Sequence, residues 1–119
     1  MAVAYTPVIP SASTNGRGIK IVQTASAGDT LHTCTSTSGE MDEVWVWVQN
    51  THSAPVAVTI QLGGTTAPDD SVTETIPTGA GLYLMVPGRR LNGGVVVKAF
   101  AGTANVCVAH VNVNRIAVT

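Results

Sequence analysis

The chain has 119 residues, of which 45% are hydrophobic and only 11% are charged, and its formal net charge is −1. A chain of this length forms one domain, and it lacks the basic excess that a nucleic-acid-binding surface needs. No apolar run approaches the roughly 20 residues of a membrane span, and residues 1–13 do not have the pattern of a signal peptide, so we expect a protein made in a cytoplasm without a membrane partner.

The residue mix favours strands over helices. Thr, Ser, Asn and Gly take the place of charged residues, whose share in globular proteins is typically about 25%, and Val is the main apolar residue. Solvent-exposed helices need Glu, Lys, Arg, Ala and Leu, whereas strands prefer β-branched residues and turns prefer Gly, Asn and Pro. The sequence therefore predicts an all-β protein. Because so little surface charge is typical of a domain covered by a partner, we also expect self-association.

Residues 1–18 are predicted to form an extended N-terminal arm, separate from the domain of residues 19–119. Pro7 and Pro10 are expected to prevent regular strand pairing, and residues 11–16 have the composition of a loop. An extended segment with apolar residues usually lies against its own domain or a neighbour, and we expect this arm to serve attachment more than folding. Its candidate contact residues are Val3, Tyr5, Val8 and Ile9.

Eight short strands, separated by segments rich in turn residues, are predicted after the arm. They lie at residues 19–25, 30–35, 44–50, 56–62, 72–76, 82–86, 95–101 and 105–118. Pro87 and Gly88 are expected to end the sixth of them. Strands at such short and regular spacing are typical of a sandwich or a barrel. We expect a single β-sandwich with jelly-roll-like connectivity, and an up-and-down barrel is the alternative.

The strand at residues 44–50 (VWVWVQN) has two different faces. Its three valines alternate with Trp45 and Trp47, and the valine face is the expected core. The Trp face suits a second packed layer, a subunit interface or a sugar-stacking platform. Burial within the domain or an oligomer is the commoner fate of such residues.

The strand at residues 56–62 alternates in the same way, between apolar and polar or small residues. Val58 and Ile60 are therefore expected in the core. Thr59 is expected on the opposite face, in contact with solvent.

No residue pattern indicates a catalytic site. His32, His52 and His110 lack the spacing of metal ligands, and we expect Cys34 and Cys107 to be reduced core residues rather than a disulfide. The serines lie in no nucleophile motif, and the glycine pairs lie in no phosphate-binding loop. We therefore expect no enzyme activity, no metal and no cofactor.

Arg89 and Arg90 form the only basic doublet of the chain. Because they follow Pro87 and Gly88, we expect a solvated hairpin tip. The alternative is a contact with an acidic partner, since Arg is favoured at interfaces.

Four stretches of the chain follow one another in a characteristic order: VWVWVQNTHSAPVAVTIQLGG, IPTGAGLYLMVPG, RRLNGGVVVKAFAG and TANVCVAHVNVNRI. An aromatic strand leads through an "IP…G" segment into an "LNGG" hairpin and then into a closing "V.V.RI" strand. This pattern, over residues 40–118, resembles the small β-sandwich decoration or cement proteins of tailed-bacteriophage capsids.

The resemblance implies a non-enzymatic virion protein on the capsid exterior, made in the host cytoplasm, that binds the major capsid protein as a homotrimer. It also implies that the N-terminal arm reaches neighbouring subunits. Trp45, Trp47, Arg89 and Arg90 are further candidate contacts with a partner or subunit. Two alternatives stay open: a carbohydrate- or receptor-binding module, indicated by the Trp face, and a tail or head-fibre component of a virion.

Overall fold

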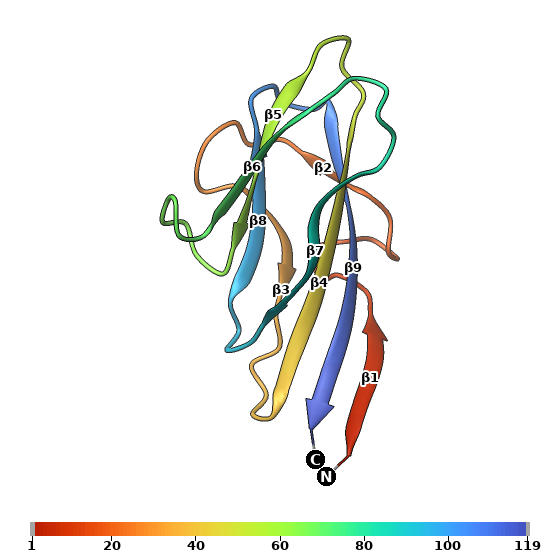
Figure 1. Ribbon diagram of the computed structural model, residues 1–119, viewed down its shortest axis with the longest axis vertical. Coiled ribbons are helices and arrows are strands. Elements are labelled where there is room, and N and C mark those ends of the chain that lie inside the picture. The colour runs from red at the N-terminus through yellow and green to blue at the C-terminus, as the bar shows by residue number, and fades with distance from the viewer. Residues whose placement is uncertain (1, 119) are drawn as a thin grey trace.

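The computed structural model describes residues 2–118, which form two β-sheets and no helix (Figure 1). The strands of these residues are β1 (Val3–Val8), β2 (Ile19–Ile21), β3 (Asp29–Thr33), β4 (Glu40–Asn50), β5 (Val56–Leu62), β6 (Ser71–Ile76), β7 (Tyr83–Leu91), β8 (Val96–Ala101) and β9 (Cys107–Val118). The expected all-β class is confirmed. No membrane-spanning helix occurs in this part of the chain.

The two sheets are connected as a jelly roll. The first sheet has the order β1-β9-β4-β7, with β2 also paired to β9, and the second has the order β3-β8-β5-β6. Four antiparallel pairs of strands lie one inside another along the chain: β2–β9, β3–β8, β4–β7 and β5–β6. Successive pairs belong alternately to the first and the second sheet. This arrangement is that of the eight-stranded jelly roll. The β-sandwich is therefore confirmed, and the alternative of an up-and-down barrel is wrong.

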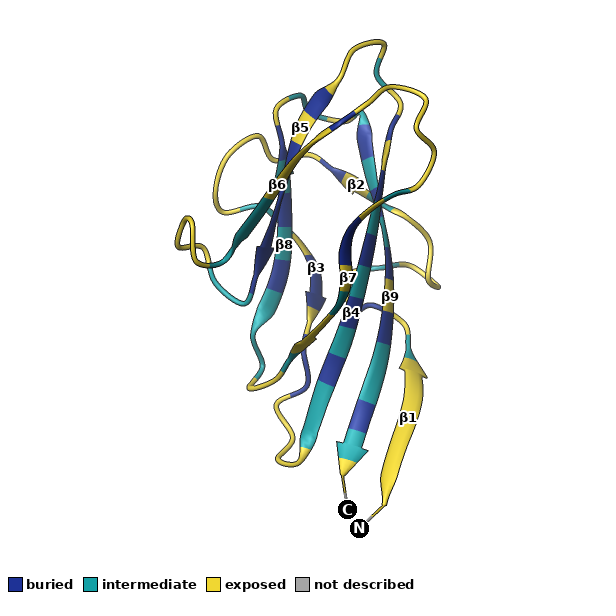
Figure 2. Ribbon diagram, viewed as in Figure 1, coloured by how far each residue is buried: buried dark blue, intermediate teal, exposed yellow. Residues whose placement is uncertain are grey.

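The core fills the space between the facing sides of the two sheets (Figure 2). The first sheet contributes the valines of β4, and Val44, Val46 and Val48 are each 0% exposed. Val58 and Ile60 on β5 of the second sheet are also 0% exposed. The faces assigned to these two strands from their alternation are therefore confirmed.

The opposite face of β5 is not solvent-exposed as expected. Thr59 and Gln61 are both buried: the Thr59 hydroxyl bonds to that of Thr73 on β6 (2.9 Å), and the loop before β3 lies against Gln61. The Gln61 side chain accepts a hydrogen bond from Gly28 N (2.9 Å) and donates one to Ser26 Oγ (2.9 Å). A Cβ atom on Gly28 would lie 2.2 Å from the carbonyl oxygen of Ala99, so only glycine allows this approach.

The first sheet extends beyond the second along its strands, and β1 lies beside β9 in this extension (Figure 1). β1 pairs with β9 from Val3 opposite Val118 to Val8 opposite Val113. The expectation that the prolines prevent pairing is wrong for Pro7, which lies opposite Asn114 within this ladder. A proline is tolerated in an edge strand because half of the N–H groups of such a strand point away from its neighbour.

Candidate functional site

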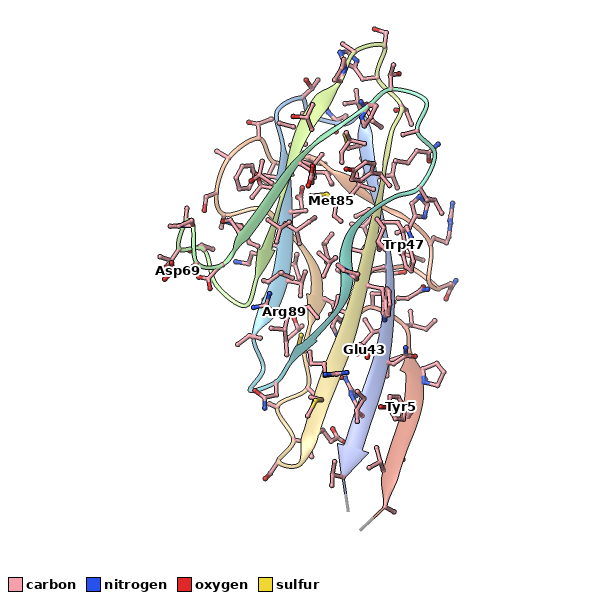
Figure 3. All side chains as sticks on the ribbon, viewed as in Figure 1. Tyr5, Glu43, Trp47, Asp69, Met85 and Arg89 are labelled. Carbon is pink, nitrogen blue, oxygen red and sulfur yellow. The ribbon has the colours of Figure 1, made fainter. Side chains whose placement is uncertain are left out.

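A groove of about 660 Å³ runs over the outer face of the first sheet. The alternation of β4 that buries its valines turns Trp45 and Trp47 outward, and β9 lies beside β4 in antiparallel register. The chain that follows β1 forms one wall. The groove is lined chiefly by Pro7, Val8, Ile9, Pro10, Glu43, Trp45, Trp47, Asn112 and Asn114. Figure 3 shows Glu43 and Trp47 on this part of the sheet, with Tyr5 on β1.

The two indole rings stack on one another in the groove. Their centroids are 6.0 Å apart and their planes differ by 15°, because residues two apart on a strand project from the same face. Trp45 Nε1 donates a hydrogen bond to Glu43 Oε1 (2.9 Å). This bond, together with Asn114 and the charge of Arg90, lowers the pKa of Glu43 although its burial acts in the opposite direction. The carboxylate is therefore ionised at neutral pH.

A bulge in β7 makes room for Trp45. The pairing of β4 with β7 passes from Val44 opposite Arg89 to Trp45 opposite Pro87, so Gly88 is the extra residue. Gly88 has φ +78°, and a Cβ atom there would lie 2.9 Å from the Trp45 ring. Pro87 and Gly88 therefore do not end the strand as expected, because an edge strand accommodates both residues at a bulge.

Arg89 and Arg90 lie within β7, so the expectation of a hairpin tip is wrong. Both side chains are exposed. Arg90 Nε lies 3.8 Å from Glu43 Oε2, at the border of the groove, and Arg89 is not among the residues that line it. Because the Arg90 side chain is 63% exposed, this ion pair contributes little to stability.

The candidate contacts of the N-terminal segment fall into two groups. Val8 and Ile9 line the groove together with the tryptophans. Val3 and Tyr5 lie outside the groove on the exposed strand β1, with exposed fractions of 54% and 63%. Whether residues 1–18 act as an arm in an assembly stays a prediction.

Sequence reasoning missed Glu43, Asn112 and Asn114 as groove residues. Asn112 and Asn114 share a face of β9 by simple alternation, which is a readable pattern. That this face adjoins the Trp face follows only from the pairing of β4 with β9, where Trp45 lies opposite Asn112. A single sequence does not give the partner of a strand.

A second cluster is buried between the sheets, around Asp42, which is 0% exposed. Arg115 donates to both carboxylate oxygens, from Nε (2.8 Å) and Nη2 (3.1 Å). Asp42 Oδ2 also accepts hydrogen bonds from His32 Nε2 (2.8 Å) and Thr35 N (3.0 Å). Because Ser11 N donates to His32 Nδ1 (3.0 Å), the hydrogen-bond pattern assigns the ring proton to Nε2 and makes the imidazole neutral.

The charge state of this cluster follows from its contacts. Burial raises the pKa of Asp42, but the hydrogen bonds from Arg115, His32 and Thr35 and the positive charge of Arg115 outweigh that effect. The pKa of Asp42 therefore lies below its ordinary value. The cluster is an ion pair of Asp42 with Arg115, to which a neutral histidine is bonded.

The cluster also contains a candidate set of metal ligands. Atoms of His32, Cys34 and Asp42 lie within 4.8 Å of one another. However, burial, followed by the charge of Asp42, raises the pKa of the Cys34 thiol to about 11, whereas a metal or a nucleophilic reaction needs the thiolate. A cation would also have to displace Arg115 from Asp42. We interpret these three residues as structural.

The remaining histidines and cysteine lie elsewhere. His52 lies in the turn between β4 and β5, and His110 lies opposite Trp47 on β9. His110 Nε2 is buried and, within residues 2–118, has no hydrogen-bond partner. Cys107 is buried at the start of β9, and both cysteines are free thiols as expected.

Removal of metal ions is expected to leave the protein unchanged, because Arg115 already neutralises Asp42 and Cys34 stays protonated. The measurement is elemental analysis of protein purified without added metal, with melting curves before and after dialysis against EDTA. A stoichiometric metal whose removal lowers the melting temperature by many degrees would contradict this prediction, and His32→Ala would then be the first variant to test.

Comparisons of the chain with protein families, with curated proteins and with solved structures gave no match.

Proposed function

We propose that the protein is a non-enzymatic structural protein of a virion that decorates the outer surface of a tailed-bacteriophage capsid. In this proposal it binds the major capsid protein and associates with copies of itself, as a trimer. The observation that carries the proposal is the exposed, uncharged edge strand β1.

β1 is the terminal strand of the first sheet, so one of its edges is free of partners among the described residues. Its sequence, VAYTPV, contains no charged residue, and five of its six residues are exposed. Soluble proteins usually protect such edges with charges or by covering them, because an open edge pairs with other chains. An edge with exposed Val3 and Tyr5 therefore suits strand addition to a neighbouring subunit.

Three further features support the proposal. The resemblance over residues 40–118 implies a capsid decoration protein. Jelly rolls are common in viral capsids and in lectins, although a fold alone does not define a function. Finally, the buried cluster around Asp42 is held by Arg115, and its Cys34 thiol is protonated at neutral pH, so this cluster lacks an activated nucleophile.

Deleting residues 2–8 is expected to abolish self-association and capsid binding while lowering the melting temperature only slightly. This truncation removes β1 but keeps Ser11, which bonds to His32 and to Thr33 N (2.7 Å). Deleting residues 2–13 is expected to destabilise the domain by a further 1–3 kcal/mol or so, because His32 Nδ1 loses its buried donor. The later part of the expected arm thus packs against the domain, where Pro10 is buried and Ser11 bonds to His32 and Thr33.

The measurements are light scattering of the purified chain at high micromolar concentration, and co-sedimentation with capsids that lack the protein. A monomeric full-length chain, or a 2–8 deletion that still binds capsids, would contradict the role of β1. Electron microscopy of virions labelled with antibody against this protein tests the location. Labelling of the tail, or no labelling at all, would exclude a decoration protein.

A further inference from the structure

We propose that the groove of Trp45 and Trp47 binds a short neutral saccharide, a role separate from the assembly role of β1. The apolar face of a pyranose ring would lie against the indoles. Its hydroxyl groups would bond to Glu43, Asn112 and Asn114 at the border of the groove.

The aromatic side chains supply a preformed apolar surface. The indole planes are within 15° of parallel and stack on one another, with centroids 6.0 Å apart, so together they form one aromatic cluster in the groove, against which an apolar ligand face can lie. Trp45 is held in place because it packs over Gly88 and bonds to Glu43, and Trp47 stacks against it. A site whose side chains are already ordered loses little conformational entropy on binding.

The polar residues around the rings match the hydroxyl groups of a sugar. Glu43 is an ionised acceptor whose side chain is 15% exposed, and its Oε2 atom lies 3.8 Å from Arg90 Nε. Asn112 is exposed and its amide offers both donors and an acceptor. Asn114 donates only a long bond of 3.4 Å to Glu43. An apolar surface with a few polar groups beside it is typical of small-molecule sites.

The size and charge of the groove narrow the class of ligand. Its volume of about 660 Å³ lies within the range of ligand pockets. Within residues 2–118, only one carboxylate, that of Glu43, lines the groove. Because glycoside hydrolysis requires two carboxyl groups on either side of the bond, the groove is suited to binding a saccharide and not to cleaving it.

A second copy of the chain fits the groove less well than a saccharide. The wall opposite the tryptophans is already formed by residues 7–10 of the same chain. The exposed apolar residues of β1, Val3 and Tyr5, lie outside the groove. Strand addition at β1 therefore leaves the indoles open to solvent.

The chain offers a direct test, because Trp45 and Trp47 are its only tryptophans. All tryptophan fluorescence of the protein therefore arises in the groove. The full-length protein is titrated with cellohexaose, maltohexaose, mannohexaose and chitohexaose while the emission is recorded. We expect at least one of these to change the emission with a saturable, millimolar or tighter dissociation constant and to protect the indoles from acrylamide quenching.

Three variants connect the binding to the groove. Trp47→Ala is expected to weaken binding about tenfold or more, the effect of losing one aromatic contact. Asn112→Ala removes an amide that is exposed on β9, so it is expected to weaken binding without changing the melting temperature. Tyr5→Ala is the matched control, an exposed aromatic residue outside the groove, and is expected to bind the hexaose normally.

Three results would overturn the proposal. The first is the absence of a saturable change with all four hexaoses. The second is binding that neither Trp47→Ala nor Asn112→Ala weakens. The third is protection of the indoles from acrylamide by self-association alone, which would make the groove an interface between copies. Because Tyr5→Ala affects assembly and Asn112→Ala affects the groove, failure of this proposal is distinguishable from failure of the decoration role.

Discussion

Replacing Arg115 with methionine is expected to lower the free energy of unfolding by about 3 kcal/mol. The variant leaves the Asp42 carboxylate, which is 0% exposed, with His32 and Thr35 N as donors but without a positive charge. Breaking a buried ion pair from one side is costly because the other charge stays buried. We expect the lower end of the usual range because the Arg115 side chain is 31% exposed and water can reach it.

Urea denaturation of the wild type and the variant measures this loss. The double variant Asp42→Leu with Arg115→Met is the control, because it removes both charges and is expected to recover much of the stability. A loss below about 1 kcal/mol in Arg115→Met would place the pair among ordinary surface ion pairs. It would also show that Asp42 is solvated in solution.

The same ion pair is expected to make stability depend on acid pH. The pKa of Asp42 is lower in the folded protein than its ordinary value, so the unfolded chain binds this proton more readily. The stabilisation is then fully present above about pH 4, the unfolded-state pKa, and is lost as pH falls through the folded pKa. Asp42→Asn is expected to flatten this part of the stability profile.

The faces of single strands could be predicted from the sequence, and the partners of those strands could not. Alternation placed the valines of β4 and β5 in the core, because side chains on a strand point to opposite sides in turn. The same alternation assigned Thr59 to solvent, and it is buried. On the same face, Gln61 is covered by the loop at Ser26 and Gly28, more than thirty residues away, and no local pattern contains that information.

The ends of strands were also predicted wrongly, at positions with proline and glycine. Pro7 and the pair Pro87 and Gly88 were read as breaks, which is their usual meaning in a central strand. Both lie in edge strands, β1 and β7, where proline is tolerated and a bulge does not end the pairing. Edge position depends on the sheet order, so it becomes visible only in the fold.

Only part of the candidate site and of the buried cluster could be predicted from the sequence, because the rest depends on which strands pair. Trp45 and Trp47 stand out because two large aromatics share one face of a strand. Asp42 carries no such mark, because an acidic residue is rarely buried, and only its ion pair with Arg115 of β9 makes its burial tolerable. Residues whose role depends on a distant partner are the ones that a single sequence leaves unassigned.

Replacing Ile60 with alanine is expected to lower the free energy of unfolding by about 2–5 kcal/mol. Ile60 is 0% exposed at the centre of β5, between β6 and β8, so the lost methyl groups leave a cavity that the neighbouring strands cannot close easily. Thr59→Ala is expected to cost only about 1 kcal/mol, although Thr59 is buried, because its main loss is one hydrogen bond to Thr73.

Gln61→Ala distinguishes a covered outer face of β5 from an exposed one. The Gln61 side chain is the hydrogen-bond partner of both Gly28 N and Ser26 Oγ. Its removal therefore leaves Gly28 N, which lies in the loop, without that partner. We expect a loss of about 1–3 kcal/mol, together with faster hydrogen exchange at Gly28. If Gln61→Ala were neutral, the loop would not cover β5 in solution. If Ile60→Ala cost no more than Thr59→Ala, the core would not lie where the two sheets face each other.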